Sequence, residues 1–531
     1  MNASRHIRIV LAFLCAMLAF SAAAAPSDQP KRGGTLHLWE PTDLRTLDPA
    51  IAYDTASEPV VRLLFRGLLE YDDGVNLVLG QAQDWNISPD GKTYTFHLRP
   101  GIKFSNGREV EAEDYVYTLQ RILDPATDSP GQGFFTDIAG AQKFVDGKAT
   151  NVTGLIAPDK HTLIVQLEQP LFTFRYSLAM TFADVVPRDI AGRYGKDFQY
   201  HLVGTGPYSL VEWRRGVRWR LARNSYYAGP DGYVDAVDIM VGGDSTTATM
   251  MLERNELDTV QATPPDAVRF ERDPKLRSWL VPVSTANTDY IFMNTEIPPF
   301  DNVLVRRAVN YAINKARLTR LTGDFAIVAH GIVPPAMSWT NASLTQYAYD
   351  PDQARALLRQ AGFTNGLKTK FSFMGDSPTF PRLAQDIQQD LSQVGIDAEM
   401  DPINSAAFEV AAGERHKLAF GVWGWFQDYP DPSDFLDVLF NGRYIIESDC
   451  NNTAFYNHTN VNQLLDQANA SLDAGERTRL YRQAEDLIMR DAPWVPLMHE
   501  VLPMVYNPRV HGTQPHPVWL YRYEWMWLDP Q

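Results

Sequence analysis

The residues best suited to bind a ligand lie in one stretch, Ala419 to Phe435, which reads AFGVWGWFQDYPDPSDF. The alternation in its first half predicts a strand, and Pro430 and Pro432 prevent that strand from continuing. Two indoles and a phenyl ring therefore lead to Asp428 on a stiff loop. Such a carboxylate can anchor a small cation while aromatic side chains exclude water. Acids beside aromatic rings are also typical of sugar sites, so these residues leave both ligand classes open.

No catalytic motif accompanies this stretch. The sequence has no nucleophile elbow, no HExxH and no CxxC. The 11 histidines are scattered, and His416, His458 and His499 lack the spacing of metal ligands, so we expect neither a metal nor a cofactor. A secreted glycosidase needs two carboxylates that can lie far apart in sequence, and it stays open as an alternative from another class.

The N-terminal segment predicts export. Arg5 and Arg8 precede an apolar run over residues 9–20, and small residues lead to Pro26, so residues 1–25 are expected to be a cleaved signal peptide. Its removal changes the net charge from -16 to -18. A chain with this charge is not suited to bind the phosphate backbone of a nucleic acid. We therefore expect a periplasmic protein with no nucleic-acid partner and no integral membrane segment in the mature chain. Its one remaining cysteine, Cys450, has acidic and amide neighbours and is expected to be inert.

The elements that position the aromatic stretch alternate between strands and helices. Residues 92–98 predict a strand with Tyr94, Phe96 and Leu98 on one face, and residues 111–123 predict a helix. In the second half we expect helices over 303–315, 351–361 and 383–394, and strands over 370–374 and 396–400. A chain of 531 residues is too long for one core, so the pattern predicts two or three domains of α/β class.

Several segments in a fixed order then resemble a known family. Their sequences are GGTL at 33–36, TLDP at 46–49, FRGLLEY at 65–71, SPDGKTYTFHLR at 88–99, GIKF at 101–104, EDYV at 113–116, GTGPY at 204–208, VRRAVNYA at 305–312 and DYPDP at 428–432. This set is similar to family 5 of the bacterial extracellular solute-binding proteins, which are the peptide-binding components of ABC importers. The resemblance extends from about Gly33 to the C-terminus.

The resemblance implies a bilobed, type II (cluster C) periplasmic-binding-protein-like fold that closes on its ligand. It also implies an extra small domain inserted in the first lobe. The expected division is residues 26–70, 180–283 and 498–531 for the first lobe, 71–179 for the small domain and 284–497 for the second lobe. The implied partners are a peptide or other small solute and an inner-membrane ABC permease, and we expect a monomer without catalytic activity.

By position, Asp428 matches the acid that holds the α-ammonium of a peptide in these relatives. Gly424 and Phe426 would offer main-chain groups, as would Tyr53, Asp54 and Thr55 from the other lobe, while Trp423 and Trp425 would line side-chain pockets. Trp423 is equally consistent with a core indole.

The sequence departs from its relatives where the carboxylate of a peptide would bind. Oligopeptide binders often have a base six positions before the aspartate, and here that residue is Val422. Dipeptide binders have an arginine just before the helix that begins near Pro381, and here the first arginine is Arg382. Either another base, such as Arg382 or Arg415, binds the carboxylate, or the ligand is a metal chelate, haem, an opine or an oligosaccharide.

Overall fold

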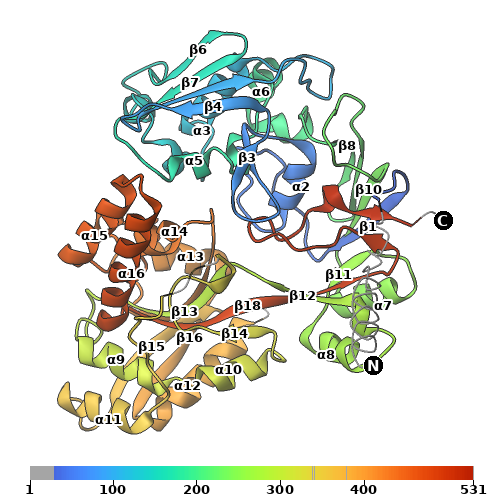
Figure 1. The fold of residues 1–531 in the computed structure, drawn as a ribbon. Helices are drawn as coiled ribbons and strands as arrows, with labels where there is room; N and C mark the ends of the chain where they lie inside the picture. Colours follow the sequence, from blue (N-terminus) through green and yellow to red (C-terminus); the bar gives the residue numbers. More distant parts are fainter. Residues whose placement is uncertain (1–28, 338, 340, 378, 530–531) are drawn as a thin grey trace, which may run out of the picture.

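The computed structural model describes residues 29–337, 339, 341–377 and 379–529, so the expected signal peptide lies outside the described residues. The fold is a bilobed α/β arrangement with a separate small domain (Figure 1). Two four-stranded sheets and one eight-stranded sheet form its framework in the described part of the chain.

The first lobe is built on the sheet β1-β10-β9-β8. β1 (Thr35–Glu40) pairs in parallel with β10 (Ala236–Val241), which joins the antiparallel β9 (Arg218–Arg223) and β8 (Tyr208–Arg214). α2 (Ser57–Leu64) buries Val60, Val61 and Leu64 in the same core as Leu36 and Leu38 of β1. The segment before α2, which contains Tyr53, is therefore fixed to this lobe.

The small domain carries the sheet β4-β5-β7-β6, with α3 packed on it. Its elements are β4 (Ala82–Ile87), β5 (Thr93–Leu98), β6 (Leu155–Asp159), β7 (Thr162–Gln166) and α3 (Ala112–Leu123). Tyr94, Phe96 and Leu98 of β5 are buried, which confirms the predicted face of this strand. Leu119, Ile122 and Leu123 of α3 bury the facing side, as expected from their spacing.

The second lobe is built on β13 (Asn287–Met293), β17 (Phe420–Phe426), β15 (Leu367–Met374) and β16 (Ile396–Ile403). One face packs on α9 (Val303–Ala312), α10 (Lys315–Leu321), α11 (Pro351–Gln360) and α12 (Phe380–Gln393). The other face packs on α13 (Ser405–Gly413), α14 (Ser433–Phe440), α15 (Thr459–Ala470) and α16 (Ala474–Asp491). In Figure 1, α14 and α15 lie at the end of this lobe nearest the small domain.

One long strand, β18 (Trp494–Tyr506), joins the two lobes (Figure 1). Its first part pairs with β13 and with β14 (Ala326–Val328), and its second part pairs with β12 (Leu280–Ser284) and β11 (Thr259–Gln261). The chain passes from β12 to β13 beside the middle of β18, where the Thr285 amide donates to Glu500 O. The lobe boundaries at 70/71, 179/180, 283/284 and 497/498 stay a prediction.

One predicted helix proves to be two. The expected helix over 303–315 ends at Ala312, and α10 begins at Lys315. The cause is Asn314, whose side chain accepts a hydrogen bond from the Arg317 amide and so caps a new helix. No helix among residues 29–529, the masked positions excepted, is long and apolar enough to cross a membrane.

Candidate functional site

β17 places the site at an open edge of the second-lobe sheet. All seven of its residues pair with β13 on one side, whereas only Gly421 has a partner, Ser372 of β15, on the other. Among the described strands, none pairs with Val422 to Phe426 on that second side. β17 ends at Phe426, as the prolines predict, and Asp428 lies at the carboxyl end of the strand. In open α/β sheets such ends, where neighbouring strands part, are common ligand sites.

Asp428 is held from both lobes. The Tyr53 hydroxyl donates to Asp428 Oδ1 over 2.5 Å, and the Asp428 amide donates to Asp434 Oδ2 over 3.1 Å. The indole Nε1 of Trp425 donates to the same Asp434 oxygen over 3.2 Å. Asp434 thus orients both the anchor and one of its aromatic neighbours.

The carboxyl groups of Asp428 and Asp434 both have raised pKa values, but to different extents. Burial raises the pKa of Asp428 to about 6, against the opposing effect of hydrogen bonds from Tyr53 and Asp434. Burial, and then the charge of Asp428, raise the pKa of Asp434 well above its usual range. This difference favours the proton on Asp434 and the negative charge on Asp428.

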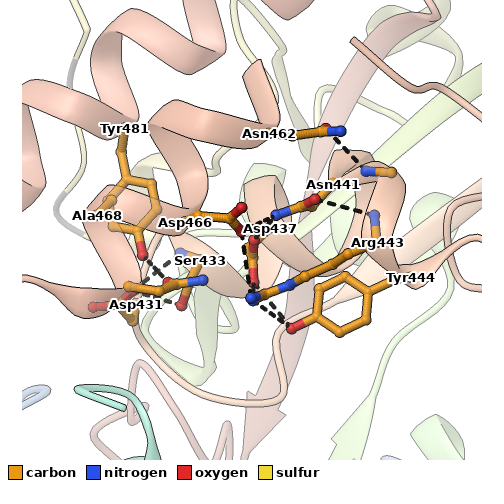
Figure 2. Close-up of polar contacts among 12 residues, drawn as sticks. Asp431, Ser433, Asp437, Asn441, Arg443, Tyr444, Asn462, Asp466, Ala468 and Tyr481 are labelled. Carbon is orange, nitrogen blue, oxygen red and sulfur yellow. Dashed lines mark hydrogen bonds and ion pairs between the residues drawn. The ribbon is translucent and has the colours of Figure 1, made fainter. Parts of the chain in front are cut away.

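The other acids after β17 are occupied by structural partners. Asp431 forms a buried bidentate ion pair with Arg477, with both oxygens 2.8 Å from Nη2. Asp437 accepts from Asn441, Arg443 and Tyr444 in the network of Figure 2. No cation pairs with Asp428 within the described residues. Its carboxylate is therefore available to a ligand.

A cluster of aromatic rings adjoins the anchor through Tyr53 and Tyr429. The Tyr53 ring lies 5.4 Å from Phe182 and 6.5 Å from Phe134, which belong to or pack against the hydrophobic core beneath the small-domain sheet. Tyr429, next to Asp428, stacks on Tyr176 at 5.8 Å and meets Phe134 edge-on at 6.5 Å. These five rings lower the local dielectric around the carboxylate, which strengthens its attraction for a cation.

The predicted residues of β17 differ in what they contact. Phe426 is 38% exposed, while Trp423 and Trp425 are half-buried. The Trp423 ring meets Phe408 of α13 edge-on at 5.7 Å, so it borders the second-lobe core. At Gly424 a Cβ would come within 2.6 Å of Asp289 Oδ1, so any larger residue would have to displace that side chain.

The first-lobe residues have separate roles. Asp54 Oδ1 accepts from the amides of Ala56 and Ser57, so its side chain holds the start of α2. Thr55 is exposed. Glu58 lies close enough to Asp428 for the two charges to interact. Burial, and then the charges of Asp428 and Asp54, raise the pKa of Glu58 to about 7, against the opposing effect of Arg62. The anchor end of the cleft is therefore acidic.

Of the two bases suggested for a ligand carboxylate, Arg415 lies away from Asp428. Arg415 pairs with Glu296 at 2.8 and 2.7 Å and with Glu447 at 3.0 Å. It precedes β17 whereas Asp428 follows it, and a seven-residue strand separates them by about 20 Å. Arg382 is exposed at the start of α12. It follows β15, which runs parallel to β17, so it stays a predicted candidate.

A large cavity adjoins the anchor on the first-lobe side. Its volume is about 1260 Å³, and its lining includes Tyr53 and Asp54 together with Arg45, Gln132, Lys196 and Asp449. We call it the distal cavity. No residue of the Asp428 loop lines it, and Tyr53 borders both regions.

Several of these features were not predicted from sequence. Asp434 as the support of Asp428, Glu58 as a neighbouring acid and the small-domain rings Phe134, Phe182 and Tyr176 were missed. The spacing of Asp428 and Asp434 on either side of a turn was the one available signal. No group of three or more metal-binding side chains occurs in the described ranges.

Comparisons with known proteins agree on the family. The model of "Bacterial extracellular solute-binding proteins, family 5 Middle" matches residues 76–445. The glutathione-binding protein GsiB of Escherichia coli K12 is 31% identical over 478 residues, which are 89% of this chain and 90% of that protein.

Solved structures have the same fold. The periplasmic binding protein DppA from Helicobacter pylori, in complex with the peptide STSA, is 27% identical with a TM-score of 0.81 and covers 94% of this chain and 99% of its own. The clavulanic acid biosynthesis oligopeptide binding protein 2 is 26% identical with a TM-score of 0.86, over 94% and 96% of the two chains.

Proposed function

The chain belongs to family 5 of the bacterial extracellular solute-binding proteins, and from this premise we propose that it captures peptides for import by an ABC permease. In this proposal the protein acts in the periplasm after cleavage of its signal peptide, as a monomer and without catalysis. Relatives named for glutathione and for peptides support the peptide class.

The single observation that carries the proposal is that Asp428, beside the open edge of β17, has no cationic partner in the part of the chain that the structure describes. An α-ammonium brought to Asp428 gains a charge-assisted hydrogen bond in a site that aromatic rings shield from water. The free main chain of β17 next to it, including Gly424 and Phe426, can pair with an extended peptide backbone. Such pairing binds peptides of many sequences, because it uses groups that all peptides share.

The side chains of a bound peptide would meet Trp423, Trp425 and Phe426, while the main chain of Tyr53, Asp54 and Thr55 would contact it from the first lobe. Each of these residues lies in or next to the two segments that the Tyr53–Asp428 bond joins. Ligand contacts from both lobes would favour the closed form, which the permease then recognises.

Titration calorimetry with di- to pentapeptides tests this function directly. Peptides with a free α-ammonium should bind, and their N-acetylated forms should bind far more weakly. Native mass spectrometry of the purified protein would identify a co-purified ligand. Binding of acetylated and free peptides with equal affinity, or of no peptide at any length, would overturn the proposal in favour of a non-peptide solute.

A further inference from the structure

We propose that the bound ligand extends from Asp428 past Tyr53 into the distal cavity, where Arg45 and Lys196 receive its anionic end. The ligand class is thus an elongated zwitterion, a peptide with a free ammonium and a free carboxylate. This inference rests on the proposed function, because it takes Asp428 as the ammonium site.

The distal cavity has a wall from each part of the molecule. The first lobe contributes Arg45, Tyr53 and Lys196, and the second lobe contributes Asp449. The small domain contributes residues 117, 120, 121, 124–130, 132 and 144–145. Its volume of about 1260 Å³ exceeds the roughly 300–1,000 Å³ that holds a drug-sized ligand. A solute of several residues fits such a space.

Tyr53 borders both the anchor and the distal cavity. Its hydroxyl bonds Asp428, and the same residue lines the cavity together with Asp54. A chain that leaves Asp428 along the first lobe therefore enters the distal cavity. An extended peptide advances by about 3.3–3.6 Å per residue, so a few residues separate its two charged ends.

Three guanidinium groups on this side of the molecule are already paired with acids. Arg62 binds Glu524 and lies over the Trp519 ring, Arg477 binds Asp431, and Arg443 binds Asp437. Breaking one of these pairs to bind a ligand would leave a buried or half-buried acid without its partner, which is costly. A carboxylate near Asp428 would also meet Glu58 and Asp54.

The charges of the distal cavity differ from those of the anchor end. Asp48 is paired with Arg121 at 2.7 and 2.5 Å, and the Asp54 and Asp124 carboxylates accept from main-chain amides. In the described structure this leaves four lining charges with no ion pair or hydrogen bond: Arg45 and Lys196 on the first-lobe wall, and Asp128 and Asp449 on the other two walls. The two cations thus share the wall that Tyr53 leads to.

Arg45 suits a carboxylate because its planar guanidinium can bind both oxygens, and Lys196 adds a second positive charge. Both side chains are exposed, so solvent and salt screen their attraction. We expect each cation to contribute about fivefold in affinity at most, and the pair more than either alone.

The test uses alanine peptides of two to five residues, each as the free acid and as the C-terminal amide, in calorimetry at low ionic strength. The Arg45→Gln/Lys196→Gln variant should bind the free acids at least about fivefold more weakly than wild type and the amides unchanged. Asp128→Asn/Asp449→Asn, which removes charges from the same cavity, is the matched control and should not weaken the acids. All four positions are exposed, and unchanged melting temperatures would confirm intact folding.

Equal binding of acid and amide by wild type, or an unchanged affinity of the double glutamine variant for the acids, would overturn this inference while leaving Asp428 as the ammonium site. Loss of affinity for acid and amide alike in that variant would also overturn it. If no free-ammonium peptide binds wild type, the proposed function itself fails, and the inference fails with it.

Discussion

The Tyr53 hydroxyl lies 2.5 Å from Asp428 Oδ1, although the two residues are 375 positions apart and belong to different lobes. Tyr53 precedes α2 of the first lobe, and Asp428 follows β17 of the second. The bond therefore spans the cleft at the position where a ligand ammonium would bind. It joins the two lobes, and it occupies one oxygen of the anchor.

Replacing Tyr53 by Phe should open the ligand-free protein. The substitution keeps the ring beside Phe134 and Phe182 but removes the interlobe bond, which as a hydrogen bond to a charged group contributes about 1.5–3 kcal/mol. Small-angle scattering should then give a larger radius of gyration without ligand and the wild-type value with ligand. Tyr176→Phe, which changes a ring of the same aromatic cluster, is the control. An unchanged ligand-free radius in Tyr53→Phe would show that other contacts keep the lobes closed.

Asp428→Asn should abolish most peptide affinity while the fold remains. The amide keeps the size of the side chain but removes the charge, and the loss of a charge-assisted bond to an ammonium costs about 3 kcal/mol, roughly a hundredfold in Kd. Calorimetry measures this change. Because burial disfavours the charge on Asp428, the variant should melt no lower than wild type. Retained affinity would assign the ammonium to another acid, with Glu58 as one alternative.

Asp431→Asn should lower the stability of the fold and leave ligand affinity near that of wild type. Asp431 and Arg477 form a buried pair with side chains 8% and 4% exposed, and Arg477 also covers the Phe172 ring. Loss of the carboxylate leaves a buried guanidinium without its partner, at a cost of about 3–5 kcal/mol in the free energy of unfolding. Urea denaturation should reveal this loss, with ligand affinity near wild type at temperatures where the variant is folded. A stability equal to wild type would contradict the structural role of Asp431.

Cys450 should react slowly with a thiol reagent in the native protein. Its side chain is 2% exposed, and burial raises the pKa of its thiol, so little thiolate is present or accessible. A chromogenic disulfide reagent should label it fully only after guanidinium unfolding. Rapid labelling of the folded protein would show that the thiol is accessible.

The parts of the fold that local patterns specify could be predicted from sequence. The face of β5 followed from the alternation of Tyr94, Phe96 and Leu98, and the start of α11 followed from Asp350, whose side chain accepts from the Gln353 amide. The end of β17 at Phe426 followed from the prolines beyond it. In each case the determining residues lie within one turn or one strand.

The relationships that create the site depend on long-range packing and were not visible. Tyr53 and Asp428 were both candidates, yet their direct bond requires the two lobes to meet. Phe134 and Phe182 reach the anchor from the small domain, and no local pattern distinguishes them from ordinary core residues. The distal cavity likewise exists because residues from three parts of the chain surround it.

Ligand affinity should fall in mildly acidic solution. Burial raises the pKa of Asp428 to about 6, so the carboxylate that binds an ammonium is charged above that pH and progressively neutral below it. The α-ammonium, with an ordinary pKa of about 7.7–8.0, stays charged between pH 5 and 7, so the change belongs to the protein. At pH 5 only about a tenth of the Asp428 side chains are ionised, and Kd should rise about tenfold relative to pH 7.

Calorimetry across this pH range measures how Kd changes. Asp428→Asn, which has no carboxyl group to titrate, should bind more weakly and with a Kd that does not change with pH. A wild-type Kd that stays constant down to pH 5 would mean that Asp428 titrates lower, and hence that hydrogen bonds from Tyr53 and Asp434 outweigh its burial.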